Sequence, residues 1–301
     1  MAPPAFVTVH RAERSFPVLP EPAVLATAVP PELADTEQQG RWAQLLPLLG
    51  SASAVALALV VHNVLYLAVA VLVVLASAGS SYASRRAMAQ RAARRARSRR
   101  EAFGRHLDEL VMTATAAATV QRAALERVHP PPDRILALVR DGGPLWERRP
   151  QHGDFGVVRL GIGAVPAVVR LGAPPASPVA EPDVPLVERL ADVVRATASI
   201  ESAPVTLDLA ALGSVAVVAA AAAGRTMLHG WLAGLTALHA PGDLHLLGLV
   251  PSAQVDHWDW TKWLPHTLDP DEVPGSVLPG ARRTIGTDPG EFERRLGAAV
   301  T

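Results

Sequence analysis

The sequence of 301 residues contains no cysteine, and this absence removes several classes of chemistry at once. Disulfide bonds, thiolate-held zinc or iron–sulfur sites and cysteine nucleophiles are all excluded. Lysine is nearly as scarce, because Lys262 is the only one and arginine supplies the rest of the basic side chains. Aromatic residues make up 4% of the chain although 50% of it is hydrophobic. Its apolar surface must therefore come mainly from Ala, Val and Leu.

Formal charge is missing from one long stretch of the chain. Residues 42–84 contain no Asp, Glu, Lys or Arg. An uncharged stretch of this length can cross a bilayer twice, with a break at His62 and Asn63 between spans at residues 45–61 and 64–78. The sequence thus predicts a two-helix transmembrane hairpin. The alternative is a buried helical hairpin of a soluble protein, although such a hairpin would normally show a polar face.

Residues 85–100, by contrast, contain eight arginines and no acidic residue. Because positive flanks stay in the cytoplasm, a multi-pass protein of the cell (inner) membrane is predicted, with both termini cytoplasmic and residues 1–41 as a tail. The arginines could contact anionic lipid headgroups or the phosphates of a nucleic acid. The neighbouring apolar stretch and the absence of interleaved aromatic residues favour inner-membrane lipids, and no nucleic-acid partner is expected.

Residues 85–129 are predicted to form an arginine-rich helical stalk, because they contain no proline and three prolines follow from Pro130. Part of this stretch shows the 4-3 spacing of a coiled-coil seam. The members of this seam are Phe103, Leu107, Leu110, Ala114, Ala117, Gln121 and Ala124. The pattern fits a coiled coil and packing on the same chain equally well.

Residues 133–301 are predicted to be an α/β cytoplasmic domain, degenerate ATPase-like or Rossmann-like. Strands at residues 157–160 and 168–171 are expected to pair with each other across a Gly-rich turn. A helix should begin near Pro185, with Asp183 as its cap.

The centre of this domain is predicted to be a βαβ unit with a parallel strand pair. Its parts are an apolar strand at residues 215–220, a helix at residues 226–239 and a buried strand at residues 244–250. In such sheets ligands bind at the carboxyl ends of the strands.

The expected turn of this unit resembles a phosphate-binding loop with two defects. Residues 219–226 read AAAAAGRT, where the motif is GxxxxGK[ST]. Gly224 and Thr226 match, but Ala219 replaces the first glycine and Arg225 replaces the lysine. The next strand also ends without an acidic residue for Mg²⁺. A degenerate nucleotide loop at Gly224, Arg225 and Thr226 is the favoured interpretation. An ordinary Rossmann-like turn and a working site are the alternatives, and no catalytic residue, cofactor or metal is expected.

Residues 257–266 read HWDWTKWLPH and hold three of the six tryptophans. The alternation of two tryptophans indicates an extended segment that anchors a loop on the domain. A partner surface is the alternative, because tryptophan is favoured at interface hot spots. The histidine and aspartate spacing is too loose to indicate zinc. The predicted interaction residues are Trp258, Asp259, Trp260, Lys262, Trp263 and His266.

Several blocks, taken in order, resemble the N-terminal part of EccC, the FtsK/SpoIIIE-type motor ATPase of the type VII (ESX-like) secretion system. They are QRAAL at residues 121–125, HP at 129–130, LWERRP at 145–150, DF at 154–155, VRLGIG at 158–163 and WDWTKWLPH at 258–266. The resemblance implies a degenerate ATPase-like domain that precedes true ATPase modules. This sequence ends at Thr301, before any such module, so a split or truncated subunit is expected.

The function implied by this resemblance is a membrane-anchoring, non-catalytic portion of the motor that links the inner-membrane complex to ATPase modules for protein export. The implied partners are EccB-, EccD- and EccE-like membrane components, a separate FtsK-type ATPase chain and further copies of the chain itself. Two alternatives stay open. One is a divergent membrane-bound nucleotide-binding enzyme that uses the loop at Gly224, and the other is a generic membrane scaffold protein.

Overall fold

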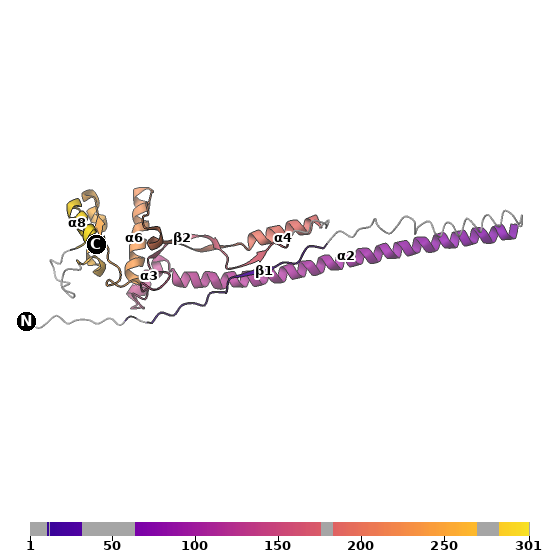
Figure 1. Cartoon of the computed structure of the whole chain (residues 1–301), viewed down its shortest axis with the longest axis horizontal. Helices are drawn as coiled ribbons and strands as arrows, with labels where there is room; N and C mark the ends of the chain where they lie inside the picture. The colour runs from indigo at the N-terminus through magenta and orange to yellow at the C-terminus, as the bar shows by residue number, and fades with distance from the viewer. Residues whose placement is uncertain (1–10, 12, 32–63, 176–182, 270–282, 301) are drawn as a thin grey trace, which may run out of the picture. The chain divides into compact units, whose positions relative to one another are not determined.

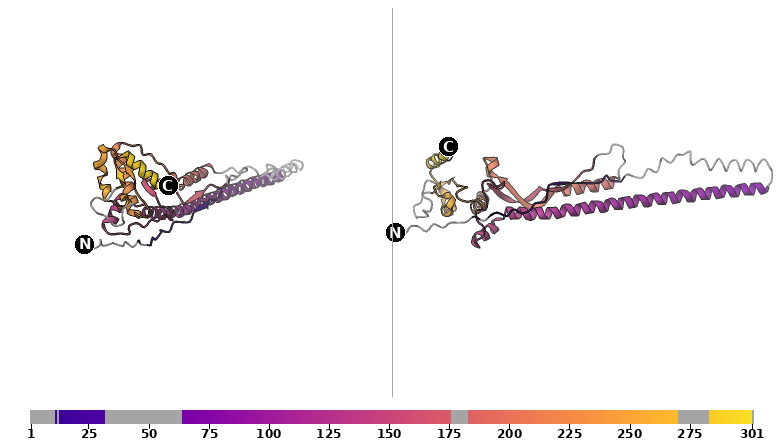
Figure 2. Two further views of the ribbon diagram at one scale, coloured as in Figure 1. Left: turned by 60° about the vertical axis from the view of Figure 1, so that its left-hand side comes forward. Right: turned by 60° about the horizontal axis from the view of Figure 1, so that its bottom comes forward.

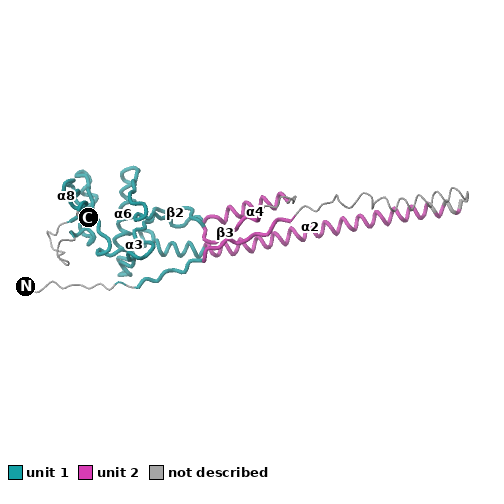
Figure 3. The backbone as a smooth tube through the Cα atoms, viewed as in Figure 1, with its two compact units in different colours: residues 1–20, 119–166, 200–301 teal, residues 21–118, 167–199 magenta. Residues whose placement is uncertain are grey.

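The computed structural model describes residues 11, 13–31, 64–175, 183–269 and 283–300, and the structural statements below concern these residues (Figure 1). The chain divides into two compact units (Figure 3). Unit 1 comprises residues 1–20, 119–166 and 200–301, and unit 2 comprises residues 21–118 and 167–199. One helix, α2 (Val64–Val128), contributes residues to both units.

Unit 2 is built around the first part of α2. It also contains β1 (Ala23–Ala26), β3 (Val169–Gly172) and α4 (Val184–Ala196), which begins after Asp183 with a proline in its first turn. β1 and β3 pair in parallel, with Ala23 opposite Val169 and Ala26 opposite Gly172. Both views of Figure 2 show α4 alongside α2.

One apolar stripe of α2 forms the core of unit 2. Phe103, Leu107 and Ala114 are buried and share one face of the helix, since they are separated by four and seven residues. They pack against Leu171 of β3 and Leu190 of α4. Two further members of the 4-3 seam, Gln121 and Ala124, are buried in unit 1. Of the two interpretations left open for the seam, the structure therefore favours packing on the same chain.

Unit 1 contains the end of α2 and most of the remaining elements. The helices are α3 (Pro132–Arg140), α5 (Leu209–Leu212), α6 (Ala221–Leu238), α7 (Val255–Trp258) and α8 (Pro289–Val300). The 3-10 helices are η1 (Ser252–Gln254), η2 (Asp259–Trp263) and η3 (Pro265–Thr267). The strands are β2 (Val157–Pro166), β4 (Ser199–Asp208), β5 (Gly248–Leu249) and β6 (Ile285–Gly286).

The core of unit 1 forms where α6 packs on β2. Trp231 and Leu235 of α6 contact Val158 of β2, and the Trp231 indole N–H donates to the carbonyl of Arg159 at 3.1 Å. Gly234 of α6 faces Ile135 of α3, and a Cβ at this position would lie 3.5 Å from the Ile135 side chain, which is an ordinary van der Waals distance. This packing sets α3, β2 and α6 around one end of α2.

The predicted transmembrane hairpin is wrong. In the part of the chain that the structure describes, no helix has an apolar stretch of the length that crossing a membrane requires. The second expected span, residues 64–78, is the start of α2, which continues without a break through the arginine cluster. Small and polar residues such as Ser77 and Gly79 shorten its apolar part. The first expected span, residues 45–61, and the break at His62 lie outside the described residues.

The predicted strand pairing and βαβ unit are also wrong. β2 pairs with β4, and β3 pairs with β1, so the two expected hairpin strands have different partners. Residues 215–220 form no strand, and Val218 is 96% exposed. Of the expected strand at residues 244–250, only Gly248 and Leu249 are in a strand, and they pair in parallel with β6. Residues 219–223 are all alanine, which favours helix, and α6 begins within this run at Ala221.

The core position Leu107 gives a direct test of unit 2. Its side chain is 1% exposed, so Leu107→Ala should lower the free energy of unfolding by about 2–5 kcal/mol through lost burial and a new cavity. Met112→Ala on the same helix is the control, because Met112 is 65% exposed. Denaturant unfolding followed by circular dichroism measures both. Equal losses in the two variants would contradict the assignment of this core.

Candidate functional site

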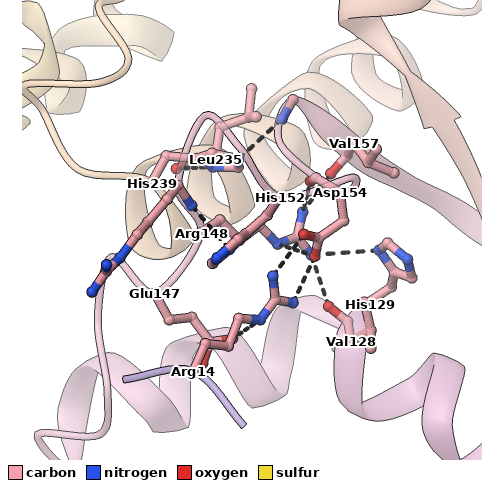
Figure 4. A network of polar contacts seen from close by, with 12 residues as sticks. Arg14, Val128, His129, Glu147, Arg148, His152, Asp154, Val157, Leu235 and His239 are labelled. Atoms are coloured by element: carbon pink, nitrogen blue, oxygen red, sulfur yellow. Dashed lines mark hydrogen bonds and ion pairs between the residues drawn. The ribbon is translucent and has the colours of Figure 1, made fainter. Parts of the chain in front are cut away.

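A buried arginine, Arg148, is the centre of the candidate site (Figure 4). It follows Trp146 and Glu147 in the segment before β2, and it is 2% exposed. Its Nη1 donates to the carbonyls of Asp154 at 3.1 Å and Val157 at 2.8 Å, and its Nη2 donates to the carbonyl of Val128 at 2.7 Å. A buried guanidinium is costly unless it is paired and hydrogen-bonded in this way.

Asp154 supplies the negative charge next to Arg148. Its Oδ2 lies 3.1 Å from Nε of Arg148, an ion pair in which the Nε–H is poorly aligned for a hydrogen bond. Arg14 holds the same carboxylate with two hydrogen bonds of 2.6 Å, one to each oxygen. Burial alone would raise the pKa of Asp154, but the hydrogen bonds from Arg14 and the charge of Arg148 outweigh it. The net pKa of Asp154 is therefore lowered, and it remains a carboxylate at neutral pH.

The segment that carries Arg14 is bound to the same region through Arg11. Nη2 of Arg11 donates to the carbonyl of Arg148 at 3.1 Å and to Asp243 at 2.7 Å, and its Nε donates to the carbonyl of Trp146 at 3.0 Å. Trp146 has a positive φ of 58°, which is unusual for a residue other than glycine. We call Arg14, His129, Arg148 and Asp154 the arginine node.

Two buried histidines, His129 of the node and the neighbouring His239, are in the neutral form. His129 follows α2, and burial followed by the charge of Arg148 lowers its pKa to about 4. His239 follows α6 and is fully buried, and burial is also the main cause that lowers its pKa to about 4. Its Nδ1–H donates to the carbonyl of Leu235 at 2.9 Å, and its Nε2 accepts from the amide of Gly156 at 3.1 Å. These partners assign the Nδ1–H tautomer.

The arginine node and the neighbouring His239 together join four parts of unit 1: the end of α2, the end of α6, the loop before β2 and the N-terminal segment. Its polar atoms are engaged in holding backbone and carboxylate groups. Such an arrangement can fix a helix end in place, and it presents no nucleophile beside a free base.

The predicted phosphate loop lies elsewhere, at the start of α6. Gly224 and Arg225 are half-buried helical residues and Thr226 is exposed. The amide of Gly224 donates to the carbonyl of Ala220 at 2.9 Å, and the Thr226 hydroxyl donates to the carbonyl of Ala222 at 3.0 Å. Helix hydrogen bonds thus occupy groups that a phosphate-binding loop would offer to its ligand.

The tryptophan block folds into short helical turns, α7 and η2, so the extended segment expected there is wrong. Trp258 and Trp260 contact His229 of α6 edge-on. The centroid of the His229 ring lies 4.7 Å from that of Trp258 and 5.4 Å from that of Trp260. His266 is 1% exposed, and its Nε2–H donates to the carbonyl of His239 at 2.8 Å. These three predicted residues therefore face the interior of unit 1.

The other predicted residues of the block face solvent. Trp263 is 75% exposed, with the ammonium of Lys262 5.4 Å from its ring centre. Lys262 also forms an exposed ion pair with Asp259 at 2.6 Å. The structure thus separates the six residues into a packed group and an exposed group.

Sequence reasoning misses most of the arginine node. Three of its members, Arg148, His129 and Asp154, appear only within the blocks that carry the resemblance, and Arg14 receives no role. One signal is present, since Asp154 is the only acidic residue between Glu147 and Glu181 in a stretch that contains several arginines. Its partner Arg14 is 140 residues away, and nothing in the spacing identifies it.

His239 makes stability depend on pH in a predictable direction. Between pH of about 6.5 and about 4, the unfolded chain binds a proton at this histidine and the folded chain does not. Stability therefore falls on acidification, by about 1.4 kcal/mol per pH unit for each such group. The stability that the ionised Asp154 contributes is lost only at lower pH, because its pKa is lowered in the folded chain. The free energy of unfolding, measured by denaturant unfolding across this pH window, should depend less steeply on pH in His239→Gln. In the exposed control His106→Gln the pH dependence should stay as in the wild type. An unchanged slope in His239→Gln would refute the buried neutral histidine.

The two groups within the tryptophan block should respond differently to truncation. Trp260→Ala removes a ring packed on His229 and should cost about 2 kcal/mol or more, whereas the exposed Trp263→Ala should leave the melting temperature near that of the wild type. Thermal melting of the purified variants measures both. Equal destabilisation by the two changes would show that the contacts are wrongly assigned.

Comparison with known proteins gives three informative relatives, although no family model matches the chain. EccC4 of the ESX-4 secretion system of Mycobacterium tuberculosis is 33% identical over 167 residues, which is 55% of this chain and 13% of EccC4. The ESX secretion system protein EccC of Thermomonospora curvata is 28% identical over 298 residues, 98% of this chain and 22% of that protein. EccCa1 of ESX-1 of M. tuberculosis is 29% identical over 199 residues, 62% of this chain and 26% of EccCa1.

The chain thus spans between 13% and 26% of the lengths of these relatives. The matches agree in naming EccC proteins of ESX systems, and one of them covers nearly the whole chain. They confirm the resemblance indicated by the sequence blocks. Most of the chain is therefore similar to an EccC-type region of ESX secretion systems.

Proposed function

We propose that this chain is a non-catalytic part of an EccC-type secretion component. Its role is to couple movements, because unit 1 holds the end of α2, and a displacement of the helix therefore also moves the rest of unit 1. An EccC-related role in type VII secretion follows from the relatives above. The observation that carries the coupling role is the bond from Arg148 to the carbonyl of Val128, the last residue of α2.

The physical basis is the unsatisfied end of a long helix. The last four carbonyls of an α-helix lack partners within the helix and carry partial negative charge. Arg148 binds the carbonyl of Val128, and Arg159 donates to the carbonyl of His129 at 2.7 Å. Hydrogen bonds from charged groups contribute about 1.5–3 kcal/mol each. The segment from Arg148 to β2 is thereby attached to α2 at its end.

The start of α6 supports the non-catalytic part of this proposal. The Gly224 amide and the Thr226 hydroxyl are used within the helix, and the first glycine and the lysine of the motif are replaced. ATP hydrolysis would then come from a separate FtsK-type ATPase chain. EccB-, EccD- and EccE-like components and further copies of this chain are the other partners that we propose.

Within the tryptophan block, Trp263 is the residue that we propose for contact with one of these partners. It is a large aromatic side chain left exposed on η2, next to the ion pair between Lys262 and Asp259. Tryptophan is enriched among the residues that dominate binding energy at protein interfaces. Trp258 and Trp260 would hold η2 in place through His229.

The coupling role is tested by changing the arginines that hold α2, in the host that carries the secretion system. Arg148→Met and Arg159→Gln should reduce export strongly, whereas Arg149→Met, a neighbouring and partly exposed arginine, should not. Because Arg148→Met leaves the buried Asp154 short of a partner, it can also unfold the chain. In that case the export measured with Arg159→Gln decides the test. Normal export from folded Arg148→Met or Arg159→Gln protein would disprove the proposal.

The competing function, nucleotide binding at Arg225, is tested by calorimetric titration of the purified chain with Mg-ATP. We expect no hydrolysis and no binding in the micromolar range. Micromolar binding that is lost in Arg225→Ala would instead favour a divergent nucleotide-binding enzyme.

A further inference from the structure

Unit 1 contains a cleft of about 480 Å³, and the coupling role uses only the arginines at its edge and none of its apolar walls. α3, β2 and α6 form its walls, and its volume lies within the usual range of ligand-binding clefts in proteins. The apolar wall residues include Pro132 and Ile135 of α3, Leu160 of β2, and Met227 and Trp231 of α6. The Trp231 indole N–H is bonded to the carbonyl of Arg159, so the ring offers the cleft mainly its apolar surface.

The apolar surface continues beyond the cleft along two of its walls. On β2, alternate residues share one face, and Leu160 and Ile162 on the face of the buried Val158 are 40% and 68% exposed. On α3, Val139 lies one turn beyond Ile135 and is 51% exposed. Exposed apolar surface of this kind marks interaction sites, and its extension beyond the cleft leaves room for an occupant longer than a small molecule, such as a protein segment.

The charges around the cleft are all positive. Arg148 and Arg159 line it together with His129, and no aspartate or glutamate is among its described lining residues. Arg148 is already paired with Asp154. Arg159 uses Nη1 on the carbonyl of His129, and within the described part of the chain no carboxylate lies at ion-pair distance from it. A guanidinium with spare donors favours a carboxylate, which it can bind through two hydrogen bonds.

We propose that this cleft binds an amphipathic segment of a partner protein, with its apolar side chains between α3 and β2 and an aspartate or glutamate of the segment on Arg159. Apolar anchors spaced along one face of a helix fit a groove of this kind. The carboxylate fixes the direction and register of the segment. This site shares Arg159 with the coupling role but does not require Arg148. The coupling role uses Nη1 of Arg159 on the carbonyl of His129, whereas binding of the segment would use its remaining donors.

Selection from a displayed library of random peptides of about twelve residues, carried out on the intact chain, tests the site even though the partner is unidentified. Leu160→Glu places a negative charge on the apolar wall at a partly exposed position, and Arg170→Gln on the exposed face of β3 is the control. Peptides enriched on the wild type and on Arg170→Gln should carry apolar residues at helical spacing and an acidic residue. They should be lost on folded Leu160→Glu. Absence of enrichment, or enrichment that Leu160→Glu does not reduce, would overturn the proposal.

An enriched peptide then tests the role of Arg159 directly. Replacing its acidic residue by the matching amide should weaken binding to the wild-type chain about fivefold, the size expected for a partly exposed ion pair. On Arg159→Gln, the acidic and amide peptides should bind equally. The same fivefold difference on Arg159→Gln would show that the carboxylate is recognised elsewhere, and it would refute the proposed orientation.

Discussion

The structure of unit 1 depends on how the buried guanidinium of Arg148 is satisfied. Removing such a group from water costs several kcal/mol, which is comparable to the net stability of a domain. Three carbonyls and the carboxylate of Asp154 meet this cost, and they come from the end of α2 and from the loop before β2. These parts must therefore be in place together, and the burial of one charge makes their positions depend on one another.

The groups around Arg148 follow from this constraint. Asp154 is shared by two arginines, so Arg14 supplies a second positive charge from the N-terminal segment. His129 and His239 stay neutral, because burial disfavours a charged imidazole and the charge of Arg148 would in addition repel it. His239 then uses its ring to connect α6 to the loop at Gly156. Neutral histidines in this position connect elements without adding charge.

Much of the helical structure could be predicted from the sequence, because helix signals are local. The proline-free stretch before Pro130 lies in α2, and Asp183 with Pro185 marks the start of α4. The EccC resemblance was readable from short blocks of the chain. The strands were harder, since β3 finds its partner in β1, more than 140 residues earlier.

The errors have related physical causes. The uncharged composition of residues 42–84 predicts a membrane hairpin, whereas the described part of that stretch belongs to α2, which continues to Val128. The alanine-rich run before Gly224 suggested a strand and a phosphate loop, but alanine favours helix, and α6 begins there. The arginine node could not be predicted, because Arg14 and Asp154 meet only through the tertiary fold.

Hydrogen exchange at the end of α2 measures the attachment by Arg148 most directly. In the intact chain, Arg148→Met should speed amide exchange around residues 124–129 by about tenfold or more, which corresponds to the loss of a charged hydrogen bond. Exchange around Leu107 in the core of unit 2 should stay unchanged, as should the whole pattern in Arg149→Met. If the end of α2 exchanges equally slowly with and without the Arg148 side chain, then Arg148 does not hold this helix, and the account of unit 1 is wrong.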